Sequence, residues 1–331
     1  MRCTCDVHTH IVPEHFPRYA GRHDGVPWPS MADAQACHKH VMISGKRYRT
    51  VHEGSWSAAR RIADMAPMQV DRQALSPMPE LLSYWLALDD AKVLVRFLNE
   101  QIAELVTAAP DRFTGLGAVP LQDVDAAIEE LRFVRTTLGF AGVELASHVN
   151  GVSIGDARFE PFFAEADRLG AAIFVHALRP AGVERLVGPF PEQAVCFPGD
   201  IALAATSMIT GGIAQRHPGL RLAFSHGGGA LPILLPRLVH AWRAMPGLRD
   251  AVPESPDVAA RRFFYDALVF DPASTRFLLD RMGASQVLLG SDYPFAMGDP
   301  DPVGSLQAAG LDDATIRAIT SDNPKRFLGL R

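Results

Sequence analysis

The chain of 331 residues alternates short apolar runs with segments of helical periodicity over nearly its whole length. The runs cover residues 3–8, 70–76, 114–119, 141–146, 172–176, 220–225, 263–268 and 286–290. Helical patterns lie between or after them, at residues 89–109, 123–138, 159–169, 200–216, 231–244, 272–282 and 312–320. A strand and a helix that take turns imply right-handed βαβ units and a parallel sheet. Eight strands favour closure into an α/β fold of the (β/α)8 barrel type over an open sheet.

Two stretches interrupt this alternation, and each follows the end of an expected strand. Residues 11–60 are rich in proline and contain a hairpin pattern across residues 41–49. Residues 178–199 are rich in proline and glycine. Loops this long in compact domains are usually functional or disordered, and the carboxyl ends of barrel strands form the catalytic side. We therefore expect one barrel domain over residues 1–331, in which residues 11–60 are an inserted lid and substrate-binding segment.

Charge and composition argue against several classes of partner. The net charge is −5 and the basic residues are scattered, so nucleic acid is not an expected partner. No apolar run reaches the roughly 18 to 20 residues that span a bilayer, so a membrane is not expected either. The start of the chain, Met1-Arg2-Cys3-Thr4-Cys5, has no signal-peptide pattern, and four cysteines make no disulfide framework. We expect a cytoplasmic protein.

Several expected strands end in residues that bind metals. His8 and His10 end the first strand, His176 ends the fifth, and Asp292 follows the last. Residues two apart on an extended segment point to the same side, so His8 and His10 can bind one cation together. Three imidazole nitrogens and one carboxylate oxygen suit Zn²⁺, or another divalent transition metal such as Mn²⁺ or Co²⁺. The sequence therefore predicts a metal-dependent enzyme.

His226 also ends an expected strand, and three glycines follow it at positions 227–229. Glycines let a backbone or a substrate come close to the ring. From the residues alone His226 can be a further metal ligand, a general acid or base, or a hydrogen-bonded core histidine. The glycine-rich setting disfavours the core histidine. A neutral imidazole is suited to take the proton of a metal-activated water near neutral pH.

Several motifs together resemble one known family. They are Asp6-Val7-His8-Thr9-His10, Gly45-Lys46-Arg47-Tyr48-Arg49, Val119-Pro120-Leu121-Gln122-Asp123, Phe224-Ser225-His226-Gly227-Gly228-Gly229, Arg237 with Ala241-Trp242-Arg243, Phe263-Phe264-Tyr265-Asp266, and Leu289-Gly290-Ser291-Asp292-Tyr293-Pro294-Phe295. In these the chain resembles the amidohydrolase superfamily, and within it the branch of 2-amino-3-carboxymuconate-6-semialdehyde decarboxylase. The resemblance covers nearly the whole chain.

The resemblance implies one Zn²⁺ held by His8, His10, His176 and Asp292, with His226 as the catalytic base. In the mechanism of the family, activated water adds to a conjugated substrate and CO₂ is lost as the adduct collapses. Arg49 matches an arginine that holds a substrate carboxylate. Arg237 matches a second arginine, which reaches into the site of the neighbouring subunit and so implies a homodimer.

The arginines can also be weighed by their chemistry. A guanidinium offers two parallel contacts to a carboxylate, which suits a small carboxylate substrate. The alternative for Arg49 is a solvated charge on the hairpin, and Arg47, two residues earlier, competes for the same role. For Arg237 the alternative is an exposed helix residue. Phe295, at the end of the last motif, completes the residues that we expect at the substrate.

One segment departs from the resemblance. The family pattern carries tryptophans after the histidine of the fifth strand, whereas residues 178–199 contain none and have only Phe190 and Phe197 as aromatics. The pocket wall is therefore changed, and this bears on the identity of the substrate more than on the chemistry.

We expect a non-oxidative, Zn-dependent decarboxylase of an unsaturated or aromatic carboxylic acid from ring catabolism, similar to 2-amino-3-carboxymuconate-6-semialdehyde. The alternative is a metal-dependent hydrolase or hydratase of a related ring-cleavage product, including hydrolysis of a carbon–carbon bond, because both reactions begin with activated water. A barrel that serves only as a scaffold fits poorly with an intact ligand set.

Overall fold

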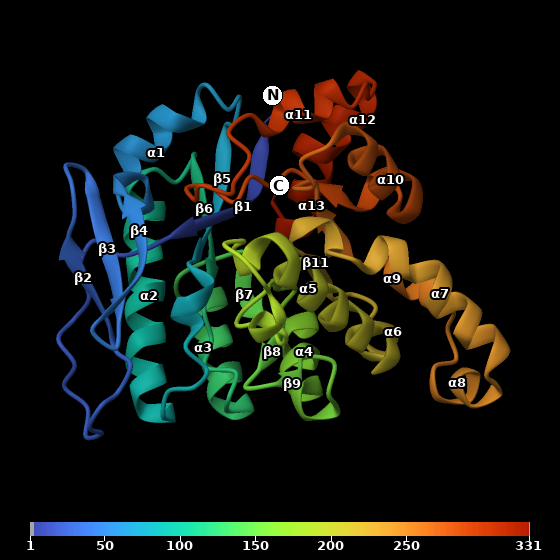
Figure 1. Ribbon diagram of the computed structural model, residues 1–331, viewed down its shortest axis with the longest axis horizontal. Helices are drawn as coiled ribbons and strands as arrows, with labels where there is room; N and C mark the ends of the chain where they lie inside the picture. Colours follow the sequence, from blue (N-terminus) through green and yellow to red (C-terminus); the bar gives the residue numbers. More distant parts are fainter. Residues whose placement is uncertain (1–2, 331) are drawn as a thin grey trace.

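Eight parallel strands follow one another around a closed barrel in chain order (Figure 1). The computed structural model describes residues 3–330, so residues 1–2 and 331 of the expected domain lie outside the described residues. The strands are β1 (Cys5–Ile11), β5 (Arg72–Pro77), β6 (Phe113–Gly117), β7 (Gly142–Ala146), β10 (Ala172–His176), β11 (Arg221–Phe224), β12 (Phe264–Asp266) and β13 (Val287–Leu288).

The last strand meets the first, which completes the barrel. The backbone N–H of Val7 donates to the carbonyl of Leu289 at 2.9 Å. Beyond it, Thr9 forms a parallel bridge with Tyr293. The predicted (β/α)8 fold is confirmed, and each of the eight predicted strands overlaps an observed one.

Helices surround the barrel at the positions that the periodicity predicts. They include α2 (Leu88–Ala108), α3 (Val124–Thr136), α4 (Glu160–Arg168), α5 (Glu192–Thr210), α6 (Ile213–Arg216), α7 (Leu231–Ala244), α10 (Pro272–Met282) and α12 (Asp313–Arg317). The carboxylate of Asp123 accepts from the N–H of Ala126 and caps α3, and Asp271 caps α10 in the same way. Shorter helices are α1 (Ala58–Met65), α8 (Pro246–Ala251), α9 (Pro256–Ala260), α11 (Pro302–Ala308) and α13 (Asn323–Leu328). None of the helices in residues 3–330 is long and apolar enough to cross a membrane.

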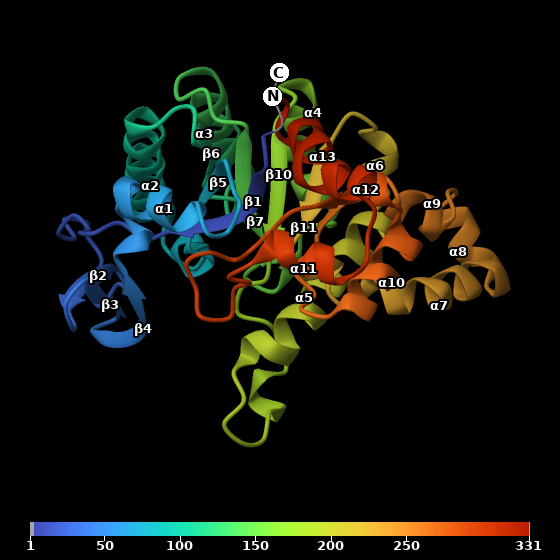
Figure 2. The ribbon, with the colours of Figure 1, turned by 90° about the horizontal axis from the view of Figure 1, so that it is seen from above.

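Helix α5 begins eight residues earlier than the predicted helix, at Glu192 instead of residue 200. Pro198 and Gly199 read as a helix break, but Pro198 lies within the helix. Figure 2 shows the start of α5 and the loop before it projecting away from the barrel.

The insertion after β1 forms a small antiparallel sheet of its own. The sheet consists of β2 (Pro29–Asp33), β3 (His38–Ile43) and β4 (Lys46–His52). Ser44 and Gly45 join β3 to β4 with positive φ angles of 52° and 70°, as a tight hairpin requires. The predicted hairpin is present, while β2 was not foreseen because its start reads as a proline-rich loop. Figure 1 shows this sheet beside α2, on the side of the barrel opposite α7 and α8.

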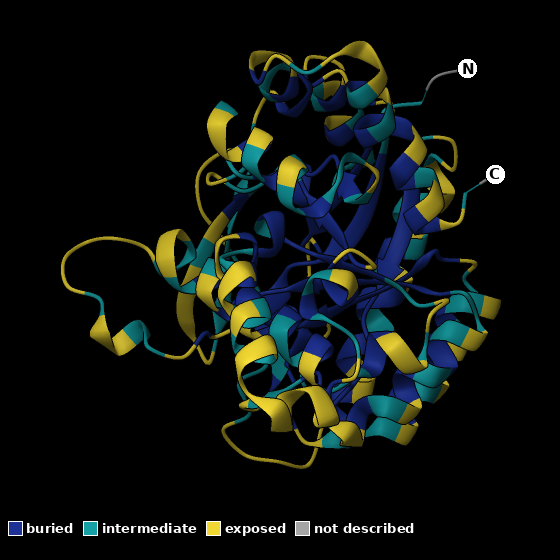
Figure 3. Ribbon diagram, turned by 90° about the vertical axis from the view of Figure 1, so that its right-hand side faces the viewer, coloured by how far each residue is buried: buried dark blue, intermediate teal, exposed yellow. Residues whose placement is uncertain are grey.

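The strands of the barrel are buried, whereas the helices and loops around them carry the exposed residues (Figure 3). The interior of the barrel is filled by small and apolar side chains: Cys5, Val7, Ala74, Leu116, Ala141, Ala172, Phe174, Ala223, Phe264 and Leu288. Phe327 and Leu328 of α13 pack against this layer. The remaining polar interior therefore lies toward the carboxyl ends of the strands.

Strand β1 contains a β-bulge that decides which side its histidines face. Asp6 pairs with Gln73 and Thr9 pairs with Leu75, so β1 has one residue more than its neighbour over this stretch. Within the bulge Val7 and His8 both point into the barrel, and beyond it His10 does so as well. With strict alternation, Val7 and His8 would face opposite sides.

Short elements complete the wall near the mouth. A two-stranded hairpin of β8 (His148–Val149) and β9 (Val152–Ser153) follows β7.

Candidate metal centre and active site

The structure brings the four predicted ligands together at the carboxyl end of the barrel. One donor atom from each of His8, His10, His176 and Asp292 lies within 4.8 Å of every other. The three histidines come from β1 and β10, and Asp292 follows β13 with a φ of 61°, a strained value for a residue with a side chain. All four are buried, with at most 8% of their surface exposed.

Hydrogen bonds fix the orientation of the three imidazole rings. Nδ1 of His8 donates to Asp266 at 2.7 Å, Nδ1 of His10 to the carbonyl of Pro77 at 3.0 Å, and Nδ1 of His176 to the carbonyl of Ala177 at 2.8 Å. These oxygens can only accept, so each Nδ1 carries the proton and each Nε2 keeps a free lone pair. The Nε2 atoms of His8 and His10 lie 3.1 Å apart.

The donor set has the features of a cation site. Within the described part of the chain, Nε2 of His176 and Oδ1 of Asp292 are buried without a hydrogen-bond partner. Burial alone would raise the pKa of Asp292, but the adjacent rings of His10 and His8 keep it well below its ordinary value. Buried polar atoms normally have partners. Three nitrogens and one ionised oxygen that converge on one point therefore fit a divalent transition metal.

Asp266 is a site residue whose role the sequence did not assign. It ends β12, and its Oδ2 accepts from Nδ1 of His8 and from the backbone N–H of His226 at 3.0 Å. Its Oδ1 accepts from the backbone N–H of Gly227 at 2.8 Å. Burial alone would raise the pKa of Asp266, but these bonds hold it below its ordinary value. The signal was available, because Asp266 is a carboxylate near the end of an expected strand.

Two further buried groups support the strand that carries His8 and His10. The Asp6 carboxylate accepts from the backbone N–H groups of His8 and Ser291, which ties β1 to the segment that carries Asp292. The fully buried guanidinium of Arg61 on α1 donates to the carbonyl of His10 at 2.7 Å and to Oγ1 of Thr9 at 2.8 Å. Arg61 lies in a segment whose helical period is too short to stand out in the sequence.

Glu144 on β7 is a buried carboxyl group close to the ligand His10. It is fully buried, and Oε2 lies 3.7 Å from Nδ1 of His10. Neither oxygen has a hydrogen-bond partner among residues 3–330. Burial raises the pKa of Glu144 to about 8, which keeps the side chain neutral around pH 7.

His226 lies beside the four ligands and, like His176 and Asp292, lines a large cavity. Its ring centroid is 4.9 Å from that of His176 and 5.3 Å from that of His8. Its φ of 55° is strained, and Gly227, Gly228 and Gly229 continue with positive φ values. Nδ1 is 3.0 Å from Oγ of Ser225, so Nε2 is the ring atom left for the cavity. Burial, the main cause, lowers the pKa of His226 to about 4, so the ring is neutral near pH 7.

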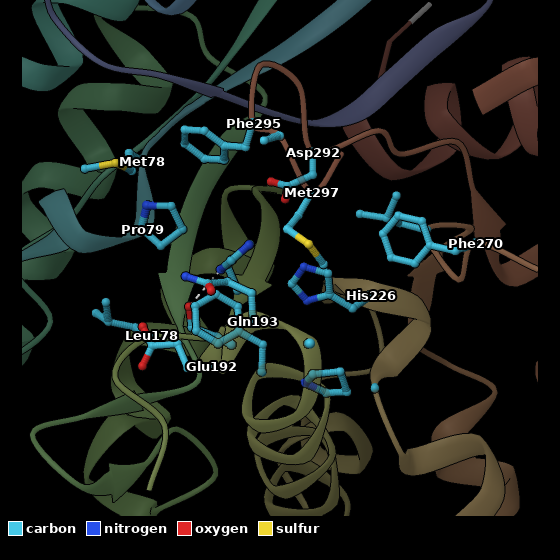
Figure 4. A pocket seen from close by; sticks show the side chains of 18 of the residues that line it. Met78, Pro79, Leu178, Glu192, Gln193, His226, Phe270, Asp292, Phe295 and Met297 are labelled. Atoms are coloured by element: carbon cyan, nitrogen blue, oxygen red, sulfur yellow. Dashed lines mark hydrogen bonds between the residues drawn. The ribbon is translucent and has the colours of Figure 1, made fainter. Parts of the chain in front are cut away.

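This cavity, with His176, His226 and Asp292 in its lining, has a volume of about 960 Å³ and opens to the surface. Figure 4 shows Asp292, Phe295 and His226 on one side of it, with Glu192 and Gln193 of α5 across from Asp292. Phe295 stacks on the ring of His10 with centroids 5.2 Å apart. The volume is in the range of cavities that take small organic ligands.

Of the two hairpin arginines, Arg49 lines the cavity and Arg47 does not. Val41 pairs with Arg49 and Met42 pairs with Arg47, so a bulge at Tyr48 turns the two arginines to opposite faces. Arg47 is exposed, while the guanidinium of Arg49 lies 4.2 Å from the ring centroid of Phe295. Sequence spacing could not separate them, because the bulge breaks the alternation.

Arg237 lies on α7 and is exposed. Arg237 is not among the described residues that line the cavity of its own chain.

The chain matches the amidohydrolase family over residues 5–330, and it belongs to that family. It is 36% identical over 327 residues to 2-amino-3-carboxymuconate-6-semialdehyde decarboxylase from Dictyostelium discoideum, which covers 98% of this chain and 91% of the relative. It is 31% identical over 222 residues to gamma-resorcylate decarboxylase from Rhodococcus jostii, which covers 61% of this chain and 66% of the relative. Within the family the chain falls in the branch of the semialdehyde decarboxylases and is a metal-dependent carboxy-lyase.

Solved structures share the fold. The apo form of IDCase from Metarhizium anisopliae superposes with a TM-score of 0.85 at 19% identity and covers 99% of this chain and 97% of that chain. A 5-carboxyvanillate decarboxylase from Novosphingobium aromaticivorans, complexed with manganese and 4-hydroxy-3-methoxy-5-nitrobenzoic acid, has a TM-score of 0.74 at 24% identity, covering 84% of this chain and 82% of that chain.

Proposed function

We propose that this chain is a non-oxidative decarboxylase of an unsaturated or aromatic carboxylic acid from ring catabolism. One observation carries the proposal. His176 and Asp292, two members of a buried set of three histidines and one aspartate, line the same cavity as a neutral His226 and Arg49. The relatives named above are decarboxylases of acids of this class.

His8, His10, His176 and Asp292 would hold the metal. We propose Zn²⁺, because nitrogen-rich sets with one carboxylate suit it, and Mn²⁺ and Co²⁺ are compatible with the same donors. A relative of the same fold is complexed with manganese. When bound, such a metal lowers the pKa of water and withdraws electrons from an oxygen in contact with it.

The residues of the chain would position the acid and move the proton. Arg49 would hold a carboxylate of the substrate, and Phe295 would pack against its planar body. When the carbon–carboxylate bond breaks, its electron pair stays on carbon, which must then take a proton. His226 would first accept a proton at Nε2, from water or from an acidic group of the substrate, and would then donate it to this carbon, since its pKa of about 4 leaves the ring neutral at pH 7 and its conjugate acid a strong proton donor.

We also propose that residues 11–60 act as the substrate-binding segment of one barrel domain, since Arg49 reaches the cavity from β4. A homodimer in which Arg237 serves the neighbouring site is supported by the exposure of Arg237 and of the nearby Ile233 and Leu234 on α7. The four cysteines are free thiols, as cytoplasmic proteins keep them.

Metal analysis and CO₂ release test the proposal together. The purified protein should contain close to one transition metal per chain, and a chelator should remove both the metal and the activity. A panel of hydroxybenzoates and of semialdehydes from ring cleavage is then scanned for CO₂. Turnover of these acids without CO₂ would point to hydration or hydrolysis instead, and the absence of any turnover with Zn²⁺, Mn²⁺ or Co²⁺ would contradict the proposal.

A further inference from the structure

The ring of His176 is oriented by a carbonyl and not by a carboxylate. Nδ1 of His8 donates to the carboxylate of Asp266 at 2.7 Å, whereas Nδ1 of His176 donates to the carbonyl of Ala177 at 2.8 Å. A charged acceptor makes the other ring nitrogen a stronger metal donor than a neutral acceptor does. On these bonds alone, the two ligands would offer a cation different electron density.

The peptide group that carries this carbonyl is itself hydrogen-bonded. It joins Ala177 to Leu178, and the N–H of Leu178 donates to Oγ of Ser147 at 3.4 Å. Oγ of Ser147 donates its single proton to Oδ2 of Asp200. A hydroxyl can accept one bond while it donates another, so all these bonds can exist at the same time. They form a continuous hydrogen-bond relay from the Asp200 carboxylate to the ring of His176.

Backbone contacts hold the relay in alignment. Ser147 directly follows β7, and its backbone N–H donates to the carbonyl of His176 at 2.8 Å. Three residues after this ligand, Nε of Arg179 donates to Oε1 of Glu80 at 3.1 Å. The segment that follows His176 is therefore anchored on both sides of the relay.

Burial strengthens the relay. Ser147 is 2% exposed and Asp200 is 7% exposed, and both Ala177 and Leu178 are buried as well. Hydrogen bonds are stronger in a buried environment, and bonds in series polarise one another by about 10 to 30% each. A carboxylate at one end therefore raises the negative charge on the carbonyl at the other end. That carbonyl then binds the Nδ1 proton of His176 more strongly.

The position of Asp200 leaves Ser147 as the route by which its charge acts. Asp200 lies in the interior of α5, away from both ends of the helix, so it is not a cap. Within residues 3–330 its carboxylate makes no ion pair, and its side chain binds Ser147. Neither residue lines the active-site cavity, so neither can touch the substrate. A buried carboxylate costs free energy unless hydrogen bonds offset it.

We propose that Asp200 is a positioning residue of the metal centre, which acts through Ser147 and the peptide group of Ala177 and Leu178 to orient His176 and to raise the electron density at its Nε2. The relay gives His176 indirectly what Asp266 gives His8 directly. This inference rests on the proposed function, because it concerns the metal centre of the same site.

The affinity for Zn²⁺ tests the relay, and competition of the full-length protein with a fluorescent chelator measures it. Asp200→Asn keeps the size of the side chain and an oxygen that can accept from Ser147, but it removes the charge. We expect the affinity to fall roughly three- to tenfold, less than is typical for the direct partner of a ligating histidine. Ser147→Ala interrupts the relay and should lower the affinity at least as much. Ser147→Thr keeps the hydroxyl and should stay within about twofold of the wild type.

The double variant separates a relay from two independent effects. If Asp200 acts through Ser147, adding Asp200→Asn to Ser147→Ala should cause no further loss of affinity, and losses that add up would overturn the inference. Asp90→Asn is the matched control. Asp90 on α2 is 5% exposed and accepts from the hydroxyl of Tyr19 at 3.1 Å, so the same change is made in a similar setting away from the relay. Its affinity should equal that of the wild type.

The ring of His176 provides a readout that a loss of stability alone would not move. In protein labelled with ¹⁵N-histidine, the proton on Nδ1 of His176 is assigned by its absence in His176→Gln. Its resonance should move to higher field in Asp200→Asn and in Ser147→Ala, since the bond to the carbonyl weakens, and should stay in place in Asp90→Asn. Melting temperatures show that each variant is folded, and Asp200→Asn and Ser147→Thr give a reading even if Ser147→Ala does not fold.

The outcomes separate the relay from the function on which it rests. An unchanged affinity in Asp200→Asn overturns the inference, and so does a loss of affinity without a shift of the His176 resonance. A wild type without affinity for Zn²⁺ contradicts the proposed metal centre, whereas a shifted resonance in the metal-free Asp200→Asn protein still supports the relay. Zn²⁺ binding that depends on Asp200, in a protein that releases no CO₂, supports the relay while contradicting the decarboxylase.

Discussion

Two regions of the site are built in different ways: the floor, which consists of the metal ligands and His226, and the wall, which carries Arg49, Arg179 and Glu192. On the floor, the metal ligands stand on the strands of the barrel or directly after them, are at most 8% exposed, and have rings fixed by Asp266 and by backbone carbonyls. The wall comes from the insertion and from the segment after β10, and its charged residues Arg49, Arg179 and Glu192 are partly exposed. The hydrogen bonds of the sheet therefore fix the chemistry, while selectivity lies in segments that can change without altering the barrel.

Removal of a floor ligand should have the largest effect. In Asp292→Asn the ionised oxygen is lost from the donor set, and we expect the metal to dissociate and kcat/KM to fall at least about 10³-fold. Elemental analysis and CO₂ release measure the two losses. Asp280→Asn, on the exposed face of α10, is the control. Full metal content in Asp292→Asn would remove Asp292 from the ligand set.

A change at His226 should separate catalysis from metal binding on the same floor. His226→Gln should retain the metal and lower kcat by about 10² to 10⁴-fold, the usual contribution of a general acid or base. The pKa of about 4 also gives the sign of the pH dependence. Above that pH the ring is neutral, and below it the ring is protonated and can no longer accept a proton. The acidic limb of kcat should therefore lie near pH 4, well below the ordinary value for histidine.

A substitution of Asp266, the carboxylate behind the metal ligands, should have an intermediate effect. Asp266→Asn weakens the acceptor of His8 Nδ1 and of two backbone N–H groups around His226. We expect metal affinity to fall about 10 to 100-fold, as is typical when the partner of a ligating histidine is changed. Competition with a fluorescent chelator measures this, and an affinity equal to that of the wild type would show that Asp266 does not orient His8.

Substitutions in the wall should change KM for the acid more than they change kcat. Arg49→Gln should raise KM for the acid about tenfold or more, with metal content unchanged, because it removes the unpaired guanidinium of the cavity. Arg47→Gln is the matched variant on the opposite face of the same strand, and its KM should change little. Equal effects of the two substitutions would place the substrate outside the cavity described above.

We expect the smallest effect from a substitution of Glu144, and this effect concerns the stability of the fold. A carboxyl group whose pKa is raised to about 8 in the fold stays protonated while the unfolded chain ionises. The native state therefore loses stability as pH rises from about 4.3 to about 8. Glu144→Gln should remove this loss, so the melting temperature of the metal-depleted variant should exceed that of the wild type increasingly up to pH 8. The gain should be about 1 to 2 °C for each kcal/mol. Glu129→Gln, exposed on α3, should show no such trend.

The floor was more predictable than the wall. Each ligand follows an apolar run, and parallel strands must bring such residues to one mouth, so the positions of His176 and Asp292 follow from topology. The wall depends on features with no simple signature in the sequence. The bulge at Tyr48 separates Arg47 from Arg49, and the pair of Arg179 with Glu80 joins residues 99 positions apart. Asp266 belongs to the predictable part, because it too stands at the end of a strand.

The apolar layer beneath the ligands sets how molecules enter and leave. None of its side chains, from Cys5 to Leu328, lines the cavity, so in the described residues this layer closes the cavity at the base of the barrel. For a decarboxylase this means that the acid and the organic product do not pass through the base of the barrel. We therefore expect the acid and the organic product to exclude each other from the cavity, because both use the same opening.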